Sequence, residues 1–571
     1  MKDMKHRIFP IALAVLGLVS CSKQMNYKEF TILDKDYITA TFSNVGGFLT
    51  QAYNTLQYDF GNYSSGAMLA SASDESVYSI MGNAIEDFYN GGWSASNPHS
   101  SMWTNMYSGI STCNTYLREM TDIDFSELIL NTDYKQQLYR YEHYPYEVRA
   151  LRAYFYFCLV RQYGDVPIVD ENLSVEEINS LSRTSSDEVF KFIISECNDV
   201  QDKIIEDYTD LGDYALGSIE TGRADKLFVL AVKAQAALYW ASPLFNPSND
   251  TERWYNAAKY YKELVAACEA RGMELTENYA DTWATLNYST PAITKEIVFA
   301  RRVGSNHTVE TYNYPVGIEN GTGGNCPTQN LVDAYDMLNG KAIDEADSGY
   351  DENNPYANRD PRLALSIAVN GDVWPTVLKL NLETFTGGTN GQPLTGATTT
   401  GYYLKKLCHG AIDISSTSKY ANDYHTYVLY RMGGIYLDYA EAVFKYLGGA
   451  DKTSSEFPVS AAELASKTRV RAGMPAFDAG LSNDAFWTKY KNERMVELAF
   501  ENHRFYDVRR WKEADKYFTT ITSMEITKNS DGSFSYKRVN SSRQWNDKMY
   551  LFPIPQSERQ KNPNLSQNTG W

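Results

Sequence analysis

The sequence has few of the residue patterns on which metal and redox sites are built. Its seven cysteines include no Cys-x-x-Cys pair, and its seven histidines include no His-Glu-x-x-His. A zinc finger, a thioredoxin-type site and a zincin-type protease therefore have no support. Four cysteines in apolar, helix-like stretches are expected to be buried thiols, with a disulfide among them left open: Cys113, Cys158, Cys197 and Cys268.

Motifs that bind nucleotides or activate a serine are also missing. There is no Gly-x-Ser-x-Gly and no Walker loop, and the run 321–326 lacks the last glycine of a dinucleotide fingerprint. Carboxylates are abundant, so sequence does not refute a glycosidase pair, which converges only in space. The formal charge of −18 argues against nucleic acid, which requires a basic surface. We therefore expect no enzymatic activity and no cofactor.

Long hydrophobic runs are limited to the start of the chain. Lys2, Lys5 and Arg7 precede the apolar run 8–19, which is too short to span a bilayer. Residues 1–20 are therefore expected to be an export signal. Leu18-Val19-Ser20-Cys21 looks like a bacterial lipobox; the alternative is an ordinary signal peptide with an incidental cysteine.

Helical periodicity runs through much of the remaining chain. Trp254-x-x-Ala257-Ala258-x-x-Tyr261 has the spacing of a tetratricopeptide first helix, repeated loosely from Trp103. No clean period of 34 residues follows, so the repeats would be degenerate and interrupted, as in an α-solenoid. Apolar stripes predict helices over 145–163, 224–242, 253–271 and about 428–447, and Ser185-x-x-Glu188 predicts a capping box.

The character of the sequence changes between about residues 273 and 425. Gly, Asn, Thr, Tyr and Pro dominate, and the stretch 301–328 is long, irregular and aromatic. Long ordered loops on a rigid scaffold are common places for binding sites. The acidic run 344–352 lacks the spacing of an EF-hand, so it is either a solvated loop or a structural calcium site.

The stretch 492–511, NERMVELAFENHRFYDVRRW, predicts one amphipathic helix. Its apolar stripe is Met495, Leu498, Ala499, Asn502 and Phe505, at helical spacing. A second stripe places opposite charges three residues apart, which suits local pairing. This stripe is either a solvated ladder or an ion-pair network buried between helices: Arg494, Glu497, Glu501 and Arg504.

The stretch 492–511 resembles the C-terminal signature of the SusD/RagB family. Further resemblances occur in RALRAYFYFCLVRQYGDVPIV, CPTQNLVDAYDMLNGK, NRDPRL and the Pro-rich C-terminus YLFPIPQSERQKNPNLSQNTGW. Members of this family are surface lipoproteins of Bacteroidetes that bind nutrients, mostly glycans, beside a TonB-dependent outer-membrane transporter. The resemblance implies a mostly α-helical, tetratricopeptide-like scaffold with a large loop-rich insertion region and few short strands.

The resemblance also implies where the protein works and with what. Cleavage before Cys21 and lipidation of that residue would anchor the chain in the outer membrane, facing the cell surface. The expected partner is a SusC-like TonB-dependent transporter. The expected ligand is a glycan, with a peptide as the alternative; a surface enzyme and a pure scaffold protein are further possibilities. The resemblance divides the chain into a signal peptide (1–20), an N-terminal region (21–225), a repeat-type helix pair (226–272) and a C-terminal region (273–571), with 46–571 as one compact unit.

Aromatic residues in loops are the candidates for a sugar-binding surface. Sugar rings have apolar C–H faces that stack on Trp and Tyr, and their hydroxyls need amide and carboxylate partners. Trp93, in a Gly- and Asn-rich loop, is the first candidate, and Trp103, Trp254 and Trp511 are set aside as core. The further candidates are Tyr312, Tyr314, Tyr288, Trp283 and Tyr78, with Asp74 and Asn97 as polar partners and no metal ligands.

Overall fold

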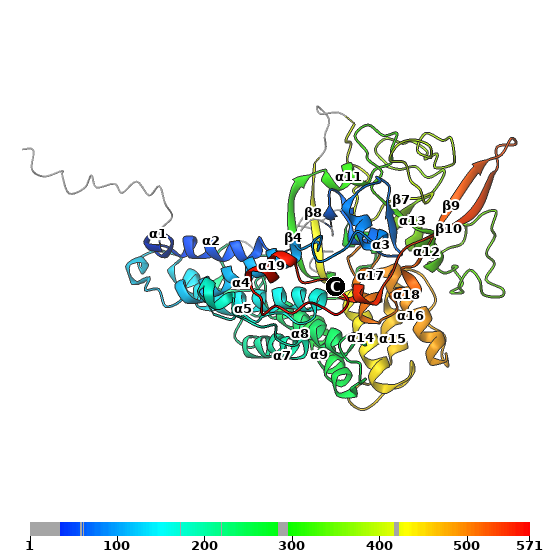
Figure 1. The fold of residues 1–571 in the computed structure, drawn as a ribbon. Helices are drawn as coiled ribbons and strands as arrows, with labels where there is room; N and C mark the ends of the chain where they lie inside the picture. The colour runs from blue at the N-terminus through cyan, green and yellow to red at the C-terminus, as the bar shows by residue number, and fades with distance from the viewer. Residues whose placement is uncertain are drawn as a thin grey trace, which may run out of the picture.

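Seven helices of the repeat scaffold pack one against the next in chain order (Figure 1). The computed structural model describes residues 35–56, 60, 62–171, 173–217, 220–283, 295–415 and 422–571. Two short helices precede the array, α1 (Lys35–Thr39) and α2 (Phe42–Tyr53). The array itself consists of α4 (Ser101–Glu119), α5 (Tyr134–Tyr163), α7 (Ser186–Val200), α8 (Lys226–Ala241), α9 (Thr251–Ala270), α14 (Met432–Leu447) and α15 (Ala461–Arg471).

A second half, built from loops and short elements, is inserted between α9 and α14 and joined there by segments from both ends of the chain (Figure 1). Its strands pair only in twos within the described residues, the longest regular pair being antiparallel β9–β10. Its helices are α3 (Asp87–Asn90), α11 (Thr308–Asn313), α12 (Gln329–Ala334) and α13 (Pro361–Ser366). Its strands are β1 (Asn62–Ser64), β2 (Ala67–Met68), β3 (Ser76–Tyr78), β4 (Ile297–Asn306), β5 (Asn325–Pro327), β6 (Ile367–Ala368), β7 (Tyr403–Leu404), β8 (Asp423–Arg431), β9 (Thr520–Lys528) and β10 (Phe534–Ser542).

The prediction of a mostly helical, tetratricopeptide-like scaffold with few short strands is confirmed. On α9, Trp254, Ala257 and Tyr261 are buried, as the repeat spacing requires, and the helix packs between α8 and α14. Small residues on these faces let neighbouring backbones approach closely. Trp103 and Trp511, also set aside as core, are buried too.

The helix expected from Pro145 begins eleven residues earlier, at Tyr134, so α5 carries Pro145 inside it. Proline in a helix interior costs about 3 kcal/mol because it removes a backbone hydrogen bond and crowds the preceding turn. Burial on the extra turns offsets that cost: Tyr141 and Tyr144 are both buried. The Tyr141 ring contacts Phe125, with ring centroids 4.9 Å apart.

The helix expected over about 428–447 also has a different start. Residues up to Arg431 belong to β8, which pairs with β4, and α14 begins only at Met432. Burial does not alternate along this strand, in which residues 425–427 are all buried, so the sequence has no period of two there. The C-terminal end is as expected: Gly448 has a positive φ of 70°, the conformation that favours glycine at a helix end.

The single helix expected over 492–511 is wrong, because the chain breaks in the middle of the motif. The first helix, α16 (Asn483–Glu497), ends at Glu497, and α17 (Arg504–Arg510) begins after a turn. Phe500 and Asn502 have φ of 61° and 64°, which no α-helix accommodates. The charged residues that were expected to pair with each other three residues apart therefore contact other partners.

Of the two interpretations of the charged stripe, the buried network is confirmed. Glu497 is fully buried and accepts hydrogen bonds from Arg362 (2.9 Å) and Arg431 (2.7 Å), and it also pairs with Arg471. Burial alone would raise the pKa of Glu497, but these three cations outweigh it and hold the pKa well below its ordinary value. Glu497 is therefore ionised in the folded protein. The partners lie on α13, at the β8–α14 junction and on α15, so one carboxylate joins both halves.

The cysteine prediction is confirmed for the described residues. All six cysteines in the part of the chain that the structure describes are buried and free, so no disulfide forms among them. Burial raises the pKa of Cys113 and Cys197 to about 12, which makes these thiols poor nucleophiles. Within the described ranges, no helix is both long enough and apolar enough to cross a bilayer.

Candidate functional site

The first candidate for ligand binding, Trp93, lies in the core. Its side chain is only 4% exposed and packs against Phe88 and Phe552, with ring centroids 4.6 Å away in both cases, and against Trp571 at 4.9 Å. The Gly- and Asn-rich loop around it thus covers the ring instead of displaying it. In this conformation the indole has no face available for a sugar.

Two more aromatic candidates are also buried. Tyr314 is fully buried, and its hydroxyl donates to the backbone oxygens of His409 (2.7 Å) and Ile412 (3.1 Å). Trp283 packs edge-on against Tyr279 at 4.8 Å, with the Lys406 ammonium 5.3 Å from its ring centre. The Tyr314 and Trp283 side chains therefore pack under loops and are not displayed to a ligand. The predictions for Tyr288 and Cys21 lie outside the described residues.

The two polar candidates are separated from each other and used differently. Asp74 is buried in a bidentate pair with Arg504, at 2.7 and 2.8 Å. Asn97 is exposed, but its amide donates to Asp87 (2.8 Å) and to the Gly92 backbone oxygen (3.1 Å). Asn97 therefore closes its own loop, and Asp74 fastens the segment before β3 to α17.

Among the candidates that the structure describes, Tyr78 and Tyr312 lie together, on the two sides of a tight turn. Tyr78, on β3, donates its hydroxyl to the backbone oxygen of Ser65 at 2.8 Å. Gly66, at the turn between β1 and β2, has a φ of 93°, and a Cβ there would lie 2.6 Å from Tyr312 Cδ1 and 2.8 Å from Tyr78 Oη. Only glycine fits between the rings, so Gly66 sets their approach.

Of this pair, Tyr312 is the ring that remains partly exposed. It lies on α11, among the loops at the top of Figure 1. Tyr78 is almost wholly buried, and burial together with the nearby Tyr312 hydroxyl raises the pKa of Tyr78 to about 12. The Tyr78 phenol is therefore neutral at physiological pH, and the two rings offer hydroxyl and ring-face contacts.

Buried asparagines hold this turn in place. Asn325 donates to the backbone oxygen of Gly66 (2.9 Å) and accepts from the backbone N–H of Met68 (2.8 Å). Its amide also donates to Asn313 (2.9 Å), the residue after Tyr312. Because the side-chain amides of Asn313 and Asn325 are fully buried, these hydrogen bonds fix the Gly66 turn and the backbone next to Tyr312.

Sequence reasoning missed the neighbours of this ring pair. Asn83 donates its amide to the backbone oxygen of Ser64 at 3.0 Å, and Ile80 and Met81 lie exposed in the loop after Tyr78. Met81, with 89% of its surface exposed, carries no period or motif that would single it out. The one signal available was the Ser64-Ser65-Gly66 turn, since glycine between polar residues predicts a close approach.

The family-like motif at the C-terminus supports this surface from below. Arg504 holds Asp74, and the buried carboxyl of the next residue, Glu75, accepts from the backbone N–H of Phe500 at 3.2 Å. Burial raises the pKa of Glu75 to about 8, with Asp74 adding to the shift. The segment that leads into β3 and Tyr78 is therefore fixed by the turn between α16 and α17.

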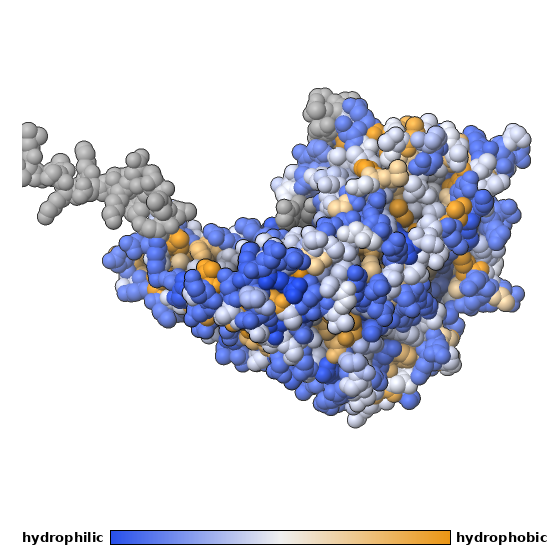
Figure 2. Space-filling view, in the orientation of Figure 1, coloured by the Kyte–Doolittle hydropathy of each residue, from blue (hydrophilic) through white to orange (hydrophobic). Residues whose placement is uncertain are grey.

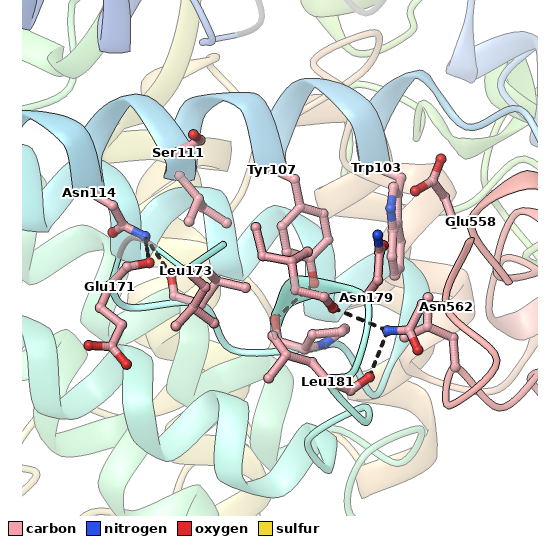
Figure 3. Close-up of a pocket in the computed structure, with 15 residues that line it drawn as sticks. Trp103, Tyr107, Ser111, Asn114, Glu171, Leu173, Asn179, Leu181, Glu558 and Asn562 are labelled. Atoms are coloured by element: carbon pink, nitrogen blue, oxygen red, sulfur yellow. Dashed lines mark hydrogen bonds between the residues drawn. The ribbon is translucent and has the colours of Figure 1, made fainter. Parts of the chain in front are cut away.

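A separate apolar pocket of about 210 Å³ lies beside the N-terminal half of α4 (Figure 3). Tyr107 donates its hydroxyl to the Pro167 backbone oxygen at 2.8 Å, and Asn114 and Asn562 donate their amides to backbone oxygens that Figure 3 draws with dashed lines. These polar groups are occupied in holding loops together, and Leu173 and Leu181 line the remainder. The pocket therefore suits a sugar, which needs several hydrogen-bond partners, less well than the Tyr312 surface does.

The acidic side chains of the run 344–352 make a contact to a distant helix, α16, and otherwise bond to their own loop. Glu345 pairs with Lys489 at 2.6 Å, and Asp351 accepts from the backbone N–H of Asn353 at 2.9 Å. Within the described ranges, no three His, Cys, Asp or Glu side chains converge in a way that could hold a metal ion. Structural calcium stays a prediction, and a calcium titration of the melting temperature would check it.

Comparison with known proteins adds family information to this geometry. A family model described as "SusD family" matches residues 295–571, and one described as "Starch-binding associating with outer membrane" matches residues 33–212. The SusD-like protein P2 of Formosa agariphila is 25% identical over 82% of this chain and 80% of its own length. With a second SusD-like protein from that organism, P25, the match spans 63% of the relative's length, slightly less than two thirds.

Solved structures of similar proteins share the fold. A SusD-like protein from Bacteroides fragilis superposes with a TM-score of 0.76 at 24% identity, over 94% of this chain and 99% of that one. A SusD-like carbohydrate-binding protein from the same species gives 0.74 at 21% identity, over 93% and 100% of the two chains. At this identity the likeness establishes the arrangement of elements, so specificity has to be argued from the residues of this chain.

Proposed function

This chain belongs to the SusD/RagB family, and we propose that it is a non-catalytic, lipid-anchored protein of the outer-membrane surface that binds a glycan. The starch-binding description of one family model and the carbohydrate-binding description of a structural neighbour support this class of ligand. The proposed anchor is Cys21, in the lipobox-like Leu18-Val19-Ser20-Cys21.

The observation that carries the proposal on this chain is the partly exposed Tyr312 ring, held rigidly over the Gly66 turn. A phenol fixed by buried amides loses little conformational freedom on binding, so stacking on the C–H face of a sugar ring is favoured. Asn83 lies beside this turn, where its amide donates to the backbone oxygen of Ser64, so the support for a sugar here comes from the ring face.

Replacing Tyr312 with Ala is expected to weaken glycan binding by about 10-fold, the ratio that a loss of 1.4 kcal/mol gives. The measurement is calorimetric titration against a panel of polysaccharides, oligosaccharides and peptides. The matched control is Tyr424→Ala, which removes another exposed tyrosine, at 51% exposure, from the loop-rich half. Trp93→Ala is a poor probe, because it would remove a core ring.

The outcomes distinguish the candidate functions. Equal loss of affinity in both variants, or no loss in either, would move the site away from Tyr312. Saturable binding of peptides alone would establish the alternative ligand class. Release of shortened products from any glycan would replace binding with catalysis.

We further propose that the bound glycan is passed to a SusC-like TonB-dependent transporter. A ligand on the loop-rich surface would then lie between the two proteins, so the binding surface would also be the docking surface. Deleting the partner should abolish uptake while leaving glycan binding by this protein intact. Normal uptake in the deletion strain would rule out the hand-over.

A further inference from the structure

One end of the helical array displays exposed apolar side chains. The connection between α4 and α5 carries Ile129 and Leu130, which are 62% and 92% exposed. Tyr37, on α1, is also exposed. We name Tyr37, Ile129 and Leu130 the apolar tip; α1 and this end of the array lie together at the left of Figure 1, and Figure 2 shows small apolar patches there on a hydrophilic surface.

The connection is ordered by its own hydrogen bonds, so the exposure of these side chains is built in. The backbone N–H of Ile129 donates to Ser126 at 3.3 Å, and that of Asn131 donates to Leu128 at 2.9 Å. Phe125, in the same connection, packs on Phe42 of α2 with ring centroids 4.0 Å apart. Phe125 is therefore buried and Leu128 partly buried, while Ile129 and Leu130 are held outward.

The chain enters the fold at this same end. Lys35, the first described residue, pairs with Glu119 at the last turn of α4, and the loop with Ile129 and Leu130 follows. A lipid attached at Cys21 lies fourteen residues before Lys35, a distance of at most about 50 Å when the chain is fully extended. The end that carries the apolar tip is therefore the part of the fold that is tethered closest to the membrane.

We infer that the apolar tip contacts the lipid surface and orients the anchored protein on it; this inference rests on the lipid anchor of the proposed function. Leucine and isoleucine gain from entering the acyl boundary, and tyrosine favours the boundary between lipid and water. The surrounding loop is acidic and contributes no attraction to anionic lipid: Asp122, Asp124, Glu127 and Asp133. The contact with lipid is thus apolar. It would be too weak to hold the protein on the membrane by itself, and it orients the protein because the lipid anchor keeps the tip close to the membrane.

The test uses the lipidated full-length protein in vesicles of zwitterionic lipid with brominated acyl chains. An environment-sensitive fluorophore is attached through Asn131→Cys, beside the tip, or through Met81→Cys in the loop-rich half, which is equally exposed at 89%. The six described cysteines are buried, so they should not react. Brominated lipid is expected to quench the label at position 131 at least about twofold and to leave the label at position 81 unchanged.

Adding Ile129→Ser and Leu130→Ser to the labelled Asn131→Cys protein should reduce quenching to the level of position 81. Equal quenching at both positions, or quenching that survives the two serines, would overturn the inference. Protection of position 131 from aqueous iodide without quenching by brominated lipid would assign the tip to a protein partner and overturn lipid contact. Flotation of the vesicles tests the anchor separately. If the protein does not float with the vesicles, the proposed anchor and the tip contact are both wrong. If it floats but position 131 is not quenched, the tip contact alone is wrong.

Discussion

Replacing Glu497 with Gln is expected to lower the free energy of unfolding by about 3–5 kcal/mol. The substitution keeps the shape of the side chain but removes the charge that Arg362, Arg431 and Arg471 share. All four residues are buried or nearly so, and solvent cannot replace the missing charge. Removing one member of a buried network costs more than the pair is worth, since its partners stay desolvated.

Urea unfolding followed by circular dichroism measures this effect. The matched control is Glu525→Gln, which removes a carboxylate that is half exposed and lies 3.4 Å from Lys537. An exposed pair of this kind contributes about 1 kcal/mol or less. Similar losses in the two variants would show that the Glu497 network is solvated in solution and would contradict the buried arrangement.

The second large effect has the opposite sign: Glu75→Gln should stabilise the protein at pH 8 by about 4 kcal/mol. The folded protein raises the pKa of Glu75 from 4.5 to about 8, so folding takes up a proton between these two values. Stability from this group is therefore complete below about pH 4.5 and declines as the pH rises toward 8. Glutamine cannot ionise, and its oxygen can still accept from the backbone N–H of Phe500.

Thermal unfolding between pH 4 and pH 8.5 tests this sign. The two proteins should be equally stable near pH 4 and diverge steadily above it, with the variant the more stable. The neighbouring Asp74→Asn serves as control, because it leaves buried Arg504 without its carboxylate and should destabilise across the same range. A constant offset between wild type and Glu75→Gln would mean that Glu75 is already ionised in the folded protein.

The scaffold could be predicted from the sequence because its signals are local. In α9, each apolar residue at repeat spacing faces a neighbouring helix, so periodicity reports burial directly. The break within 492–511 could not be predicted this way. Phe500 and Asn502 adopt positive φ because Glu497 and Glu501 are drawn to partners from other parts of the chain, notably Arg431. Periodicity in a short window contains no information about these partners.

The candidate site was harder for a similar reason. Trp93 and Tyr312 both lie in Gly- and Asn-rich segments, and composition cannot tell a ring beneath a loop from a ring upon it. The difference is made by distant residues: Phe552 and Trp571 cover Trp93, whereas Gly66 leaves one ring of the pair partly open. Which of these aromatic rings is exposed to solvent therefore depends on tertiary contacts, which the local sequence does not reveal.

The insertion of the loop-rich half between α9 and α14 sets the order in which the chain can fold. These helices are neighbours in the array, yet α9 ends at Ala270 and α14 begins at Met432. The contact between them closes a loop of residues 271–431, and contacts of such long sequence separation form slowly. The other consecutive helix pairs of the array are closer in sequence, so the α9–α14 contact is expected to form last, and the faces of α9 that it covers stay exposed longest.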